Sequence, residues 1–138
     1  MQITFTIPGN PVGKGRPKFA RRGKFTVCYT PEKTASYENL VKIAAANAML
    51  DRAPMDEAVS IELMILVTPP ASWSLKKRTA SLNGIVYPTT KPDIDNVLKG
   101  ICDACNGIVF LDDKQVVDCI VSKRYAEKAG CVVIVKSL

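Results

Sequence analysis

Histidine is absent from this chain of 138 residues, and long apolar runs are absent as well. Without imidazole, the chain cannot use a histidine general base, a histidine zinc ligand or a serine-histidine-aspartate triad. The most apolar stretch, residues 61–67, contains Glu62 and is far shorter than the roughly 18 residues of a membrane-spanning helix. Catalysis therefore has to depend on carboxylates, lysines, hydroxyls or thiols, and we expect no membrane contact.

The chain also has no recognisable disulfide framework. Its five cysteines are an odd number, and their positions (28, 102, 105, 119 and 131) follow no regular spacing. Most stand beside apolar residues, and the first ten residues lack the basic start and apolar block of a secretory signal. A chain of this length buries roughly two-thirds of its unfolded surface without cross-links. We therefore expect reduced, buried thiols in a cytoplasmic protein that folds as a single domain over residues 1–138.

Acidic residues are missing from residues 1–31, and the basic residues there account for the whole net charge of +6. These basic residues are Lys14, Arg16, Lys18, Arg21, Arg22 and Lys24. Few apolar residues accompany them, which predicts an exposed arm or loop over about residues 9–24. A segment of one charge sign on an otherwise balanced chain indicates a polyanionic partner, and the alternative is a solvated basic loop.

Hydrophobic periodicity predicts an α+β domain with a mixed sheet and about three helices. Apolar patterns predict strands at 2–7 and 25–29, a largely buried central strand at 58–68, and a closing antiparallel pair at 116–126 and 131–136. Helical spacing predicts helices at 32–50, 72–82 and 92–106, with Thr30 and Pro31 starting the first and Gly107 ending the last. The middle helix carries a second basic cluster, Lys76, Lys77 and Arg78, and residues 85–87 form a short extended piece after it.

The helix predicted at 92–106 has a polar and an apolar stripe. The polar stripe consists of Asp95, Lys99, Asp103 and Asn106, and the apolar stripe of Ile94, Leu98, Ile101, Cys102 and Cys105. The apolar position of Cys102 and Cys105 favours core packing over zinc or redox chemistry for this pair. Two structural alternatives stay open: Asp93 can be a helix cap, and Asp95 and Lys99 can form an ion pair one turn apart.

Two acidic pairs flank this helix. Asp93 and Asp95 open it, and Asp112-Asp113 follows it, so we expect the two pairs to meet at the same end of the sheet. Carboxylates that converge without histidine or thiolate make an all-oxygen site, which suits Mg²⁺ or Mn²⁺. Lys99 beside such a site can neutralise the extra charge of a pentacovalent phosphate while a metal-activated water attacks. The pattern therefore predicts metal-dependent phosphodiester chemistry.

Taken together, these motifs resemble the RusA family of Holliday junction resolvases, which prophages commonly encode. The resemblance rests on Lys91-Pro92-Asp93-x-Asp95-Asn96-x-x-Lys99, on Asp103-Ala104, Asn106-Gly107 and Asp112-Asp113-x-Gln115-Val116, and on the N-terminal Gly13-Lys14-x-Arg16-Pro17 and Tyr29-Thr30-Pro31. It implies a homodimeric, Mg²⁺-dependent endonuclease of DNA recombination and repair. Such an enzyme binds four-way DNA junctions and nicks two opposing strands symmetrically.

The resemblance further implies an active site of Asp93, Asp95, Lys99 and Asp113, with the three aspartates as metal ligands. Asp112 is the alternative to Asp113. We favour Asp113, because Leu111 should point into the core and alternation along an extended chain turns Asp113 the same way. The basic residues of the N-terminal segment and of the cluster at 76–78 are the expected DNA-binding residues.

Two other functions share part of these features. A non-catalytic DNA-binding protein would need the basic residues but not the clustered acids, which repel phosphate unless a metal is present. Another Mg²⁺-dependent phosphotransferase could share the acids but would not need six basic residues on one segment. A nuclease assay with and without Mg²⁺ distinguishes the three functions.

Overall fold

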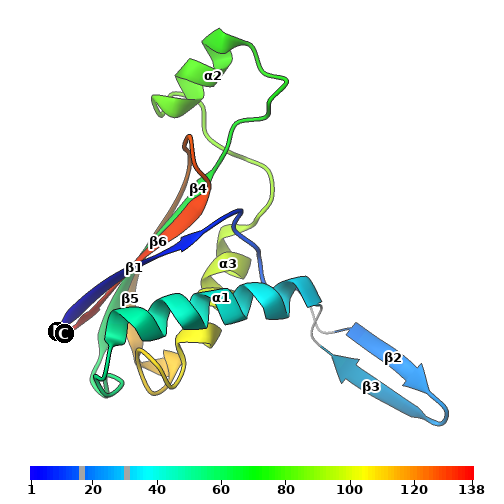
Figure 1. The fold of residues 1–138 in the computed structure, drawn as a ribbon, viewed down its shortest axis with the longest axis vertical. Helices are drawn as coiled ribbons and strands as arrows, with labels where there is room; N and C mark the ends of the chain where they lie inside the picture. Colours follow the sequence, from blue (N-terminus) through cyan, green and yellow to red (C-terminus); the bar gives the residue numbers. More distant parts are fainter. Residues whose placement is uncertain (16–17, 30–31) are drawn as a thin grey trace.

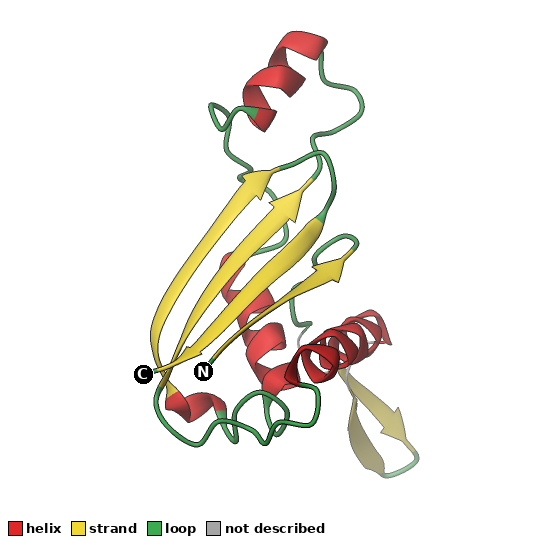
Figure 2. Ribbon diagram, turned by 60° about the vertical axis from the view of Figure 1, so that its left-hand side comes forward, coloured by secondary structure: helices red, strands yellow, loops and turns green. Residues whose placement is uncertain are grey.

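The computed structural model describes residues 1–15, 18–29 and 32–138, and the predicted single α+β domain is confirmed. A mixed four-stranded sheet forms the body, and helices α1 (Glu32–Met49) and α3 (Ile94–Cys105) cover one of its faces (Figures 1 and 2). Two parts project from this body: helix α2 (Leu75–Leu82) and a hairpin of strands β2 (Lys18–Arg22) and β3 (Phe25–Tyr29). No helix in the described ranges is long and apolar enough to cross a membrane.

The sheet has the strand order β1-β6-β4-β5. β6 (Gly130–Ser137) is antiparallel to both β1 (Gln2–Pro8) and β4 (Val59–Val67), whereas β4 and β5 (Val116–Tyr125) are parallel. Parallel neighbours need a crossover connection, and here the crossover contains α2, α3 and the 3₁₀ helix η1 (Asp113–Gln115). The chain thus returns from the carboxyl end of β4 to the amino end of β5, and α3 begins near the carboxyl ends of these two strands.

The predicted antiparallel pairing of the last two strands is wrong. Both strands exist, as β5 and β6, but β4 lies between them and pairs with each. Strands lie about 4.8 Å apart, so the four residues 126–129 are long enough to pass over one intervening strand. The apolar strand β4 gains paired neighbours on both edges in this arrangement, which an edge position would not provide.

The core lies on one face of the sheet. On β4, Ile61, Leu63 and Ile65 are buried, whereas Glu62 and Met64 are exposed. The predicted largely buried strand is therefore central but buried on one side only, because α1 and α3 both pack on that side. The buried residues of the other sheet strands and of the helices are Ile3, Phe5, Ile7, Val133, Val135, Tyr37, Val41, Ala45, Met49, Val97 and Ile101, among others.

The three predicted helices are confirmed with small changes at their ends. α2 begins three residues later than predicted, because the Ser74 hydroxyl accepts a hydrogen bond from the Lys77 amide at 3.2 Å and caps the helix. Gly107 follows α3 with a φ of 78°, as expected of a residue that ends a helix. Thr30 and Pro31, the predicted start of α1, lie outside the described residues.

Two details of the helical region differ from prediction. Ile94 is 39% exposed rather than part of the apolar stripe, because it lies in the first turn of α3, beside solvent. Residues 85–87 form no strand and belong to the connection between α2 and α3. The remaining apolar stripe of α3 is buried or half-buried against the sheet.

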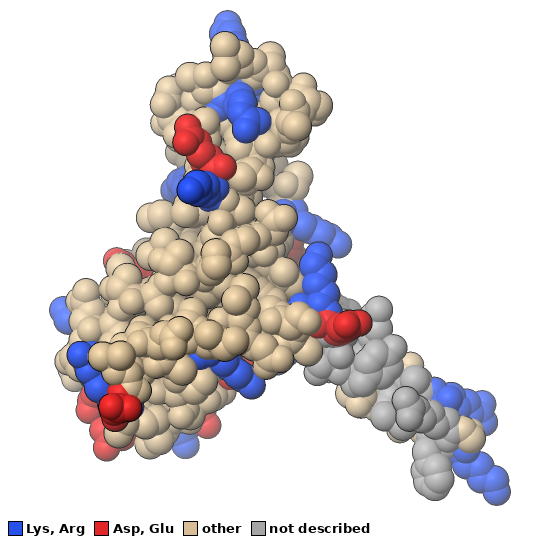
Figure 3. All heavy atoms as spheres, viewed as in Figure 1, with Lys and Arg blue, Asp and Glu red and all other residues tan. Residues whose placement is uncertain are grey.

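The basic segment contains more regular structure than the predicted arm or loop. β2 and β3 form an antiparallel hairpin, and Gly23 in its turn has a φ of 62°. β2 lacks a strand signature in the sequence, because basic residues interrupt any apolar alternation. Figure 3 shows basic side chains at the far end of this hairpin.

Three of the five cysteines are buried, and all five are free. Cys102 and Cys105 belong to the core, as predicted, and burial raises the pKa of each thiol to about 12. The prediction is wrong for Cys28 and Cys119, which are exposed on the hairpin and on the edge strand β5.

Candidate active site

Helix α3 begins with the first acidic pair. Asp93 is its N-cap residue, but the carboxylate makes no capping hydrogen bond. Asp95 lies in the first turn, and both residues are exposed. Negative charge is favourable here, because the amino end of a helix carries partial positive charge. The Asp93 carboxylate is therefore free of the structural role that a side-chain cap would give it.

The pair borders a groove of about 710 Å³. Its walls come from three segments: the chain after β1, the first turn of α1 and the loop that enters α3. The lysines Lys14, Lys33 and Lys91 line the groove together with the two acids. Such a mixture can bind a phosphate group both directly, through the ammonium groups of Lys33 and Lys91, and through a cation held by the carboxylates.

Residues 13–15 are attached to the starts of α3 and α1. The Lys14 amide donates to the Asn96 carbonyl at 2.9 Å, and the Gly15 amide donates to the Thr34 hydroxyl at 3.0 Å. A Cβ at position 13 would lie 3.0 Å from the Asn96 Cβ, so a larger residue would displace the start of α3. Two motif segments that are far apart in the sequence thus meet at the groove.

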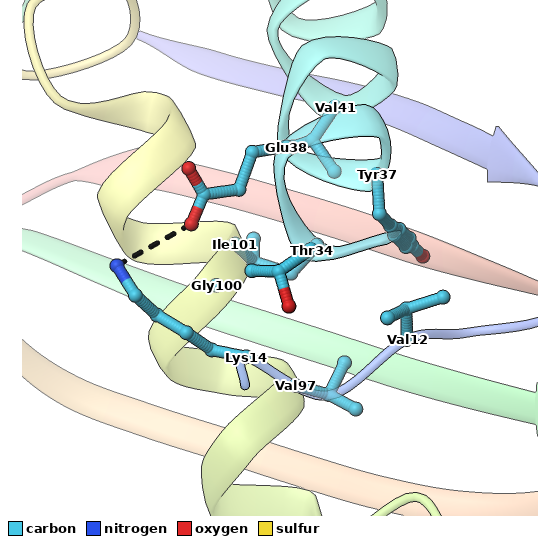
Figure 4. Close-up of a pocket in the computed structure, with 9 residues that line it drawn as sticks. All are labelled: Val12, Lys14, Thr34, Tyr37, Glu38, Val41, Val97, Gly100 and Ile101. Carbon is cyan, nitrogen blue, oxygen red and sulfur yellow. Dashed lines mark ion pairs between the residues drawn. The ribbon is translucent and has the colours of Figure 1, made fainter. Parts of the chain in front are cut away.

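The Lys14 side chain lies between α1 and α3. Its ammonium pairs with Asp103 of α3 and with Glu38 of α1, the latter at 3.3 Å (Figure 4). The hydrogen bond to Asp103 is the largest cause that raises the pKa of Lys14. DNA binding by Lys14 stays a prediction, but its charge is already balanced inside the protein.

The second acidic pair lies at η1, where Asp112 has a structural role. Its carboxylate accepts a hydrogen bond from the Lys114 amide at 3.0 Å, while its own amide donates to Oε1 of Gln115 at 2.9 Å. This reciprocal capping box holds the turn that precedes β5. The hydrogen bond from the Lys114 amide is also the largest cause that lowers the pKa of the Asp112 carboxyl.

The Asp113 carboxyl interacts electrostatically with Lys99 and Asp103 of the polar stripe of α3. Burial raises the pKa of its carboxyl, as do the neighbouring acids Asp112 and Asp103, whereas Lys99 lowers it. The predicted reason for favouring Asp113 over Asp112 is wrong, because Leu111 is 58% exposed rather than in the core. Asp113 begins a 3₁₀ turn, so strand alternation does not apply to it.

The two acidic pairs lie at opposite ends of α3, contrary to the expectation that they meet. Asp93 precedes α3 near the carboxyl end of β5, whereas η1 leads directly into the amino end of that strand. Over the described ranges, no group of three or more His, Cys, Asp or Glu side chains is placed to hold a metal ion. The alternative ion pair between Asp95 and Lys99 is also absent from the described ranges. The two ion pairs found there are those of Lys14 with Glu38 and with Asp103.

The other predicted DNA-binding residues that the structure describes belong to the two projecting parts. Arg21 and Lys24 are exposed on the hairpin, while Arg16 and the side chains of Lys18 and Arg22 lie outside the described part. On α2, Lys76 and Lys77 are exposed and Arg78 is half-buried. The Lys77 Nζ lies 4.1 Å from the ring centroid of Trp73, within cation–π range.

Three lysines near the groove were not assigned a role from the sequence. Lys33 and Lys91 line it, and the Lys123 ammonium donates to two carbonyl groups in the loop that enters α3. Lys91 is the first residue of the motif Lys91-Pro92-Asp93-x-Asp95, which is its signal in the sequence. The sequence holds no signal for Lys33 or Lys123, because only the fold brings them near Asp93.

Comparison with known proteins identifies the family. The family model described as endodeoxyribonuclease RusA matches residues 8–136, nearly the whole chain. The chain belongs to the RusA family. This family of Holliday junction resolvases is the one that the motifs resemble, so the resemblance is confirmed. An uncharacterized protein, YqaN of Bacillus subtilis (strain 168), is 34% identical over 138 residues, which cover 99% of this chain and 96% of the relative.

Proposed function

We propose that this RusA family member is a Mg²⁺-dependent endonuclease that acts as a homodimer and cuts four-way DNA junctions by paired symmetric nicks. The observation that carries the proposal is the groove at the start of α3, where Asp93 and Asp95 lie among lysines. Carboxylates repel phosphate, so an acidic pair in a phosphate-binding groove needs a cation. Mn²⁺ should replace Mg²⁺, since both ions prefer oxygen donors.

The donor set at the groove fits Mg²⁺. This ion is usually held by one or two protein carboxylates and completes its octahedron with water and substrate phosphate oxygens. Asp93 and Asp95 are therefore sufficient as its ligands at the groove, and Asp113, which lies at the opposite end of α3, is proposed as a further acid that acts beside Lys99. A bound Mg²⁺ would neutralise charge on the phosphate and lower the pKa of a water molecule.

The chain's own side chains supply the remaining chemistry. Lys99 lies one turn along α3 from Asp95, and its ammonium can stabilise the extra negative charge of the pentacovalent phosphate. Lys33 and Lys91 can hold the phosphates that flank the reacting one. Lys99 also lowers the pKa of the Asp113 carboxyl, so the two opposite charges interact.

The hairpin and α2 extend the basic surface beyond the groove (Figures 1 and 3). Their exposed residues, among them Arg21, Lys24, Lys76 and Lys77, can contact phosphates along the arms of a junction. Phosphate contacts position a duplex without reading its sequence, which suits an enzyme that recognises the shape of a branch. Two symmetric nicks need two active sites, and a dimer with twofold symmetry provides them.

A cleavage assay on a synthetic four-way junction, with a linear duplex of matching sequence as control, tests this proposal. We expect nicks at equivalent positions in two opposing strands with Mg²⁺ or Mn²⁺, none with EDTA, and an intact linear duplex. Analytical ultracentrifugation should give twice the monomer mass. Junction binding without cleavage in either metal would instead indicate a non-catalytic DNA-binding protein.

A further inference from the structure

The loop that leads into α3, residues 86–92, determines where Asp93 stands. In the described part of the chain, no backbone–backbone hydrogen bond outside the helices and strands involves these residues. Asp93 itself accepts one such bond, from the Val97 amide at 3.1 Å, which belongs to the first turn of α3. Hydrogen bonds between backbone groups therefore do not hold this loop in place.

The ammonium group of Lys123 holds this loop. Its Nζ donates to the Thr90 carbonyl at 2.6 Å and to the Pro92 carbonyl at 2.9 Å. Pro92 directly precedes Asp93, so the second hydrogen bond ends one residue from the proposed metal ligand. Hydrogen bonds from a charged donor are stronger than those between neutral groups, and two of them restrain the loop at two points.

Lys123 can act as an anchor because it belongs to the sheet. It stands in β5 opposite Ile65 of β4, a fully buried residue of the central strand. The Lys123 side chain is half-buried, and in the described ranges it forms no ion pair with a carboxylate. Its ammonium is thus directed at backbone carbonyls and connects the loop to the central sheet.

We propose that Lys123 is a positioning residue that fixes the backbone from which Asp93 presents its carboxylate. The inference rests on the proposed nuclease function, because Asp93 is a ligand only in that function. A misplacement of about 1 Å at a reacting group can lower a rate by roughly 100-fold. Loss of the Lys123 anchor should therefore lower turnover, although the residue does not touch the DNA.

Lys123→Met and Lys123→Arg are the informative variants. Methionine keeps much of the apolar stem and removes the charged donor, and we expect kcat on junctions to fall about 10-fold or more, with a higher Mg²⁺ concentration needed for half-maximal rate. Junction affinity should change less than about twofold, because no phosphate contact is lost. Arginine keeps a charged donor and should restore a large part of kcat.

Lys128→Met is the matched control. Lys128 is exposed in the connection between β5 and β6, so the change removes the same charge without a contact to the loop. This variant should keep the kcat and the Mg²⁺ dependence of the wild type. Thermal unfolding of each variant establishes that it is folded before its rate is compared.

Hydrogen exchange in the metal-free protein provides a second readout that does not need activity. Exchange of the Val97 amide, which bonds to the Asp93 carbonyl, should be faster in Lys123→Met than in the wild type, while amides of β1 and β6 stay unchanged. If the wild-type protein cleaves no junction, the proposed function is wrong, and this exchange result alone decides whether Lys123 anchors the loop.

Three results would overturn the inference. The first is wild-type kcat and Mg²⁺ dependence in Lys123→Met. The second is a loss of junction affinity as large as the loss of kcat, which would make Lys123 a phosphate contact. The third is unchanged exchange of the Val97 amide.

Discussion

The two ends of α3 carry similar acidic pairs in different environments. At the amino end, Asp93 makes no capping hydrogen bond, and it borders an open groove with Asp95. At the other end, Asp112 of the pair at η1 is occupied by a capping box, and Asp103 in the last turn of α3 is occupied by the Lys14 ammonium. A carboxylate that already accepts hydrogen bonds from its own protein is a poor candidate for a new ligand. The comparison shows that residue type and spacing identify acidic pairs, whereas hydrogen bonding decides which members are free.

The largest effect is expected at the free end of the helix. Asp93→Asn or Asp95→Asn should lower junction cleavage about 1,000-fold or more, because each change removes a proposed Mg²⁺ ligand. Junction binding should survive or become tighter, since a negative charge near phosphate is also removed. Single-turnover cleavage and gel-shift titrations measure the two effects separately.

Asp51→Asn is the control for these variants. Asp51 is exposed beyond the carboxyl end of α1, whereas the groove lies at the amino end of this 18-residue helix. The control should cleave like the wild type. An Asp93→Asn or Asp95→Asn variant that cleaves equally well would show that the free acids are not ligands.

The next largest effect is expected at Lys99, between the two ends. Lys99→Ala should lower turnover about 100-fold, the usual scale for loss of one electrostatic donor, with little change in junction affinity. Lys42→Ala, which removes an exposed lysine from α1, is the control. If affinity falls as far as turnover, Lys99 binds ground-state phosphate instead.

Replacing the two acids at η1, Asp112 and Asp113, should have different effects on cleavage. Asp113→Asn is expected to lower turnover about 10-fold or more, because it removes the carboxylate that interacts with Lys99. Asp112→Asn keeps a side chain that can cap, and its turnover should stay near that of the wild type. Comparable losses in both variants would contradict the distinction between a free and an occupied acid. A raised Mg²⁺ requirement in Asp113→Asn alone would make Asp113 a ligand.

Basic residues can likewise be free or already paired within the protein, and this difference predicts a moderate effect on DNA binding. Replacing Arg21 and Lys24 by glutamine should flatten the plot of log affinity against log salt by up to about two units, since each neutralised phosphate contributes about 0.9. Lys14→Met should leave this slope unchanged and lower Tm, because it leaves Glu38 and Asp103 without their cation. Dimer stoichiometry has to be established first, because a dimer carries each residue twice. An unchanged slope in the hairpin variant would make the hairpin a solvated element without DNA contact.

The smallest effect concerns the pH dependence of stability in the metal-free protein. The pKa of Asp113 is raised in the folded state, so the stability that its protonated carboxyl contributes is fully present below the unfolded pKa and is lost as the pH rises through the folded pKa. Asp113→Asn should therefore raise Tm slightly at neutral pH, and the difference should vanish in acid, where the wild-type carboxyl is protonated. Differential scanning calorimetry between pH 3 and pH 7, values chosen to bracket about pKa 3.9 of a free Asp, measures this difference. A Tm lower than that of the wild type at neutral pH would show that Asp113 makes a stabilising contact.

The sequence by itself determined most of the elements, the polar stripe of α3 and the family. Helical periodicity predicts α1, α2 and α3, and the acidic motif with Lys99 predicts phosphodiester chemistry, because both depend on neighbours within a few residues along the chain. The motifs around Asp93 and Asp113 also resemble the family whose model matches residues 8–136.

Only the tertiary structure decided the strand order and the availability of each charge. The insertion of β4 between β5 and β6 depends on which edges an apolar strand can pair, and no local pattern encodes that choice. The ion pairs of Lys14 and the hydrogen bonds of Lys123 to Thr90 and Pro92 join residues that are distant in sequence. Distances of a few ångströms determine whether such groups are free or engaged, and these distances exist only after the crossover has placed α3 against the sheet.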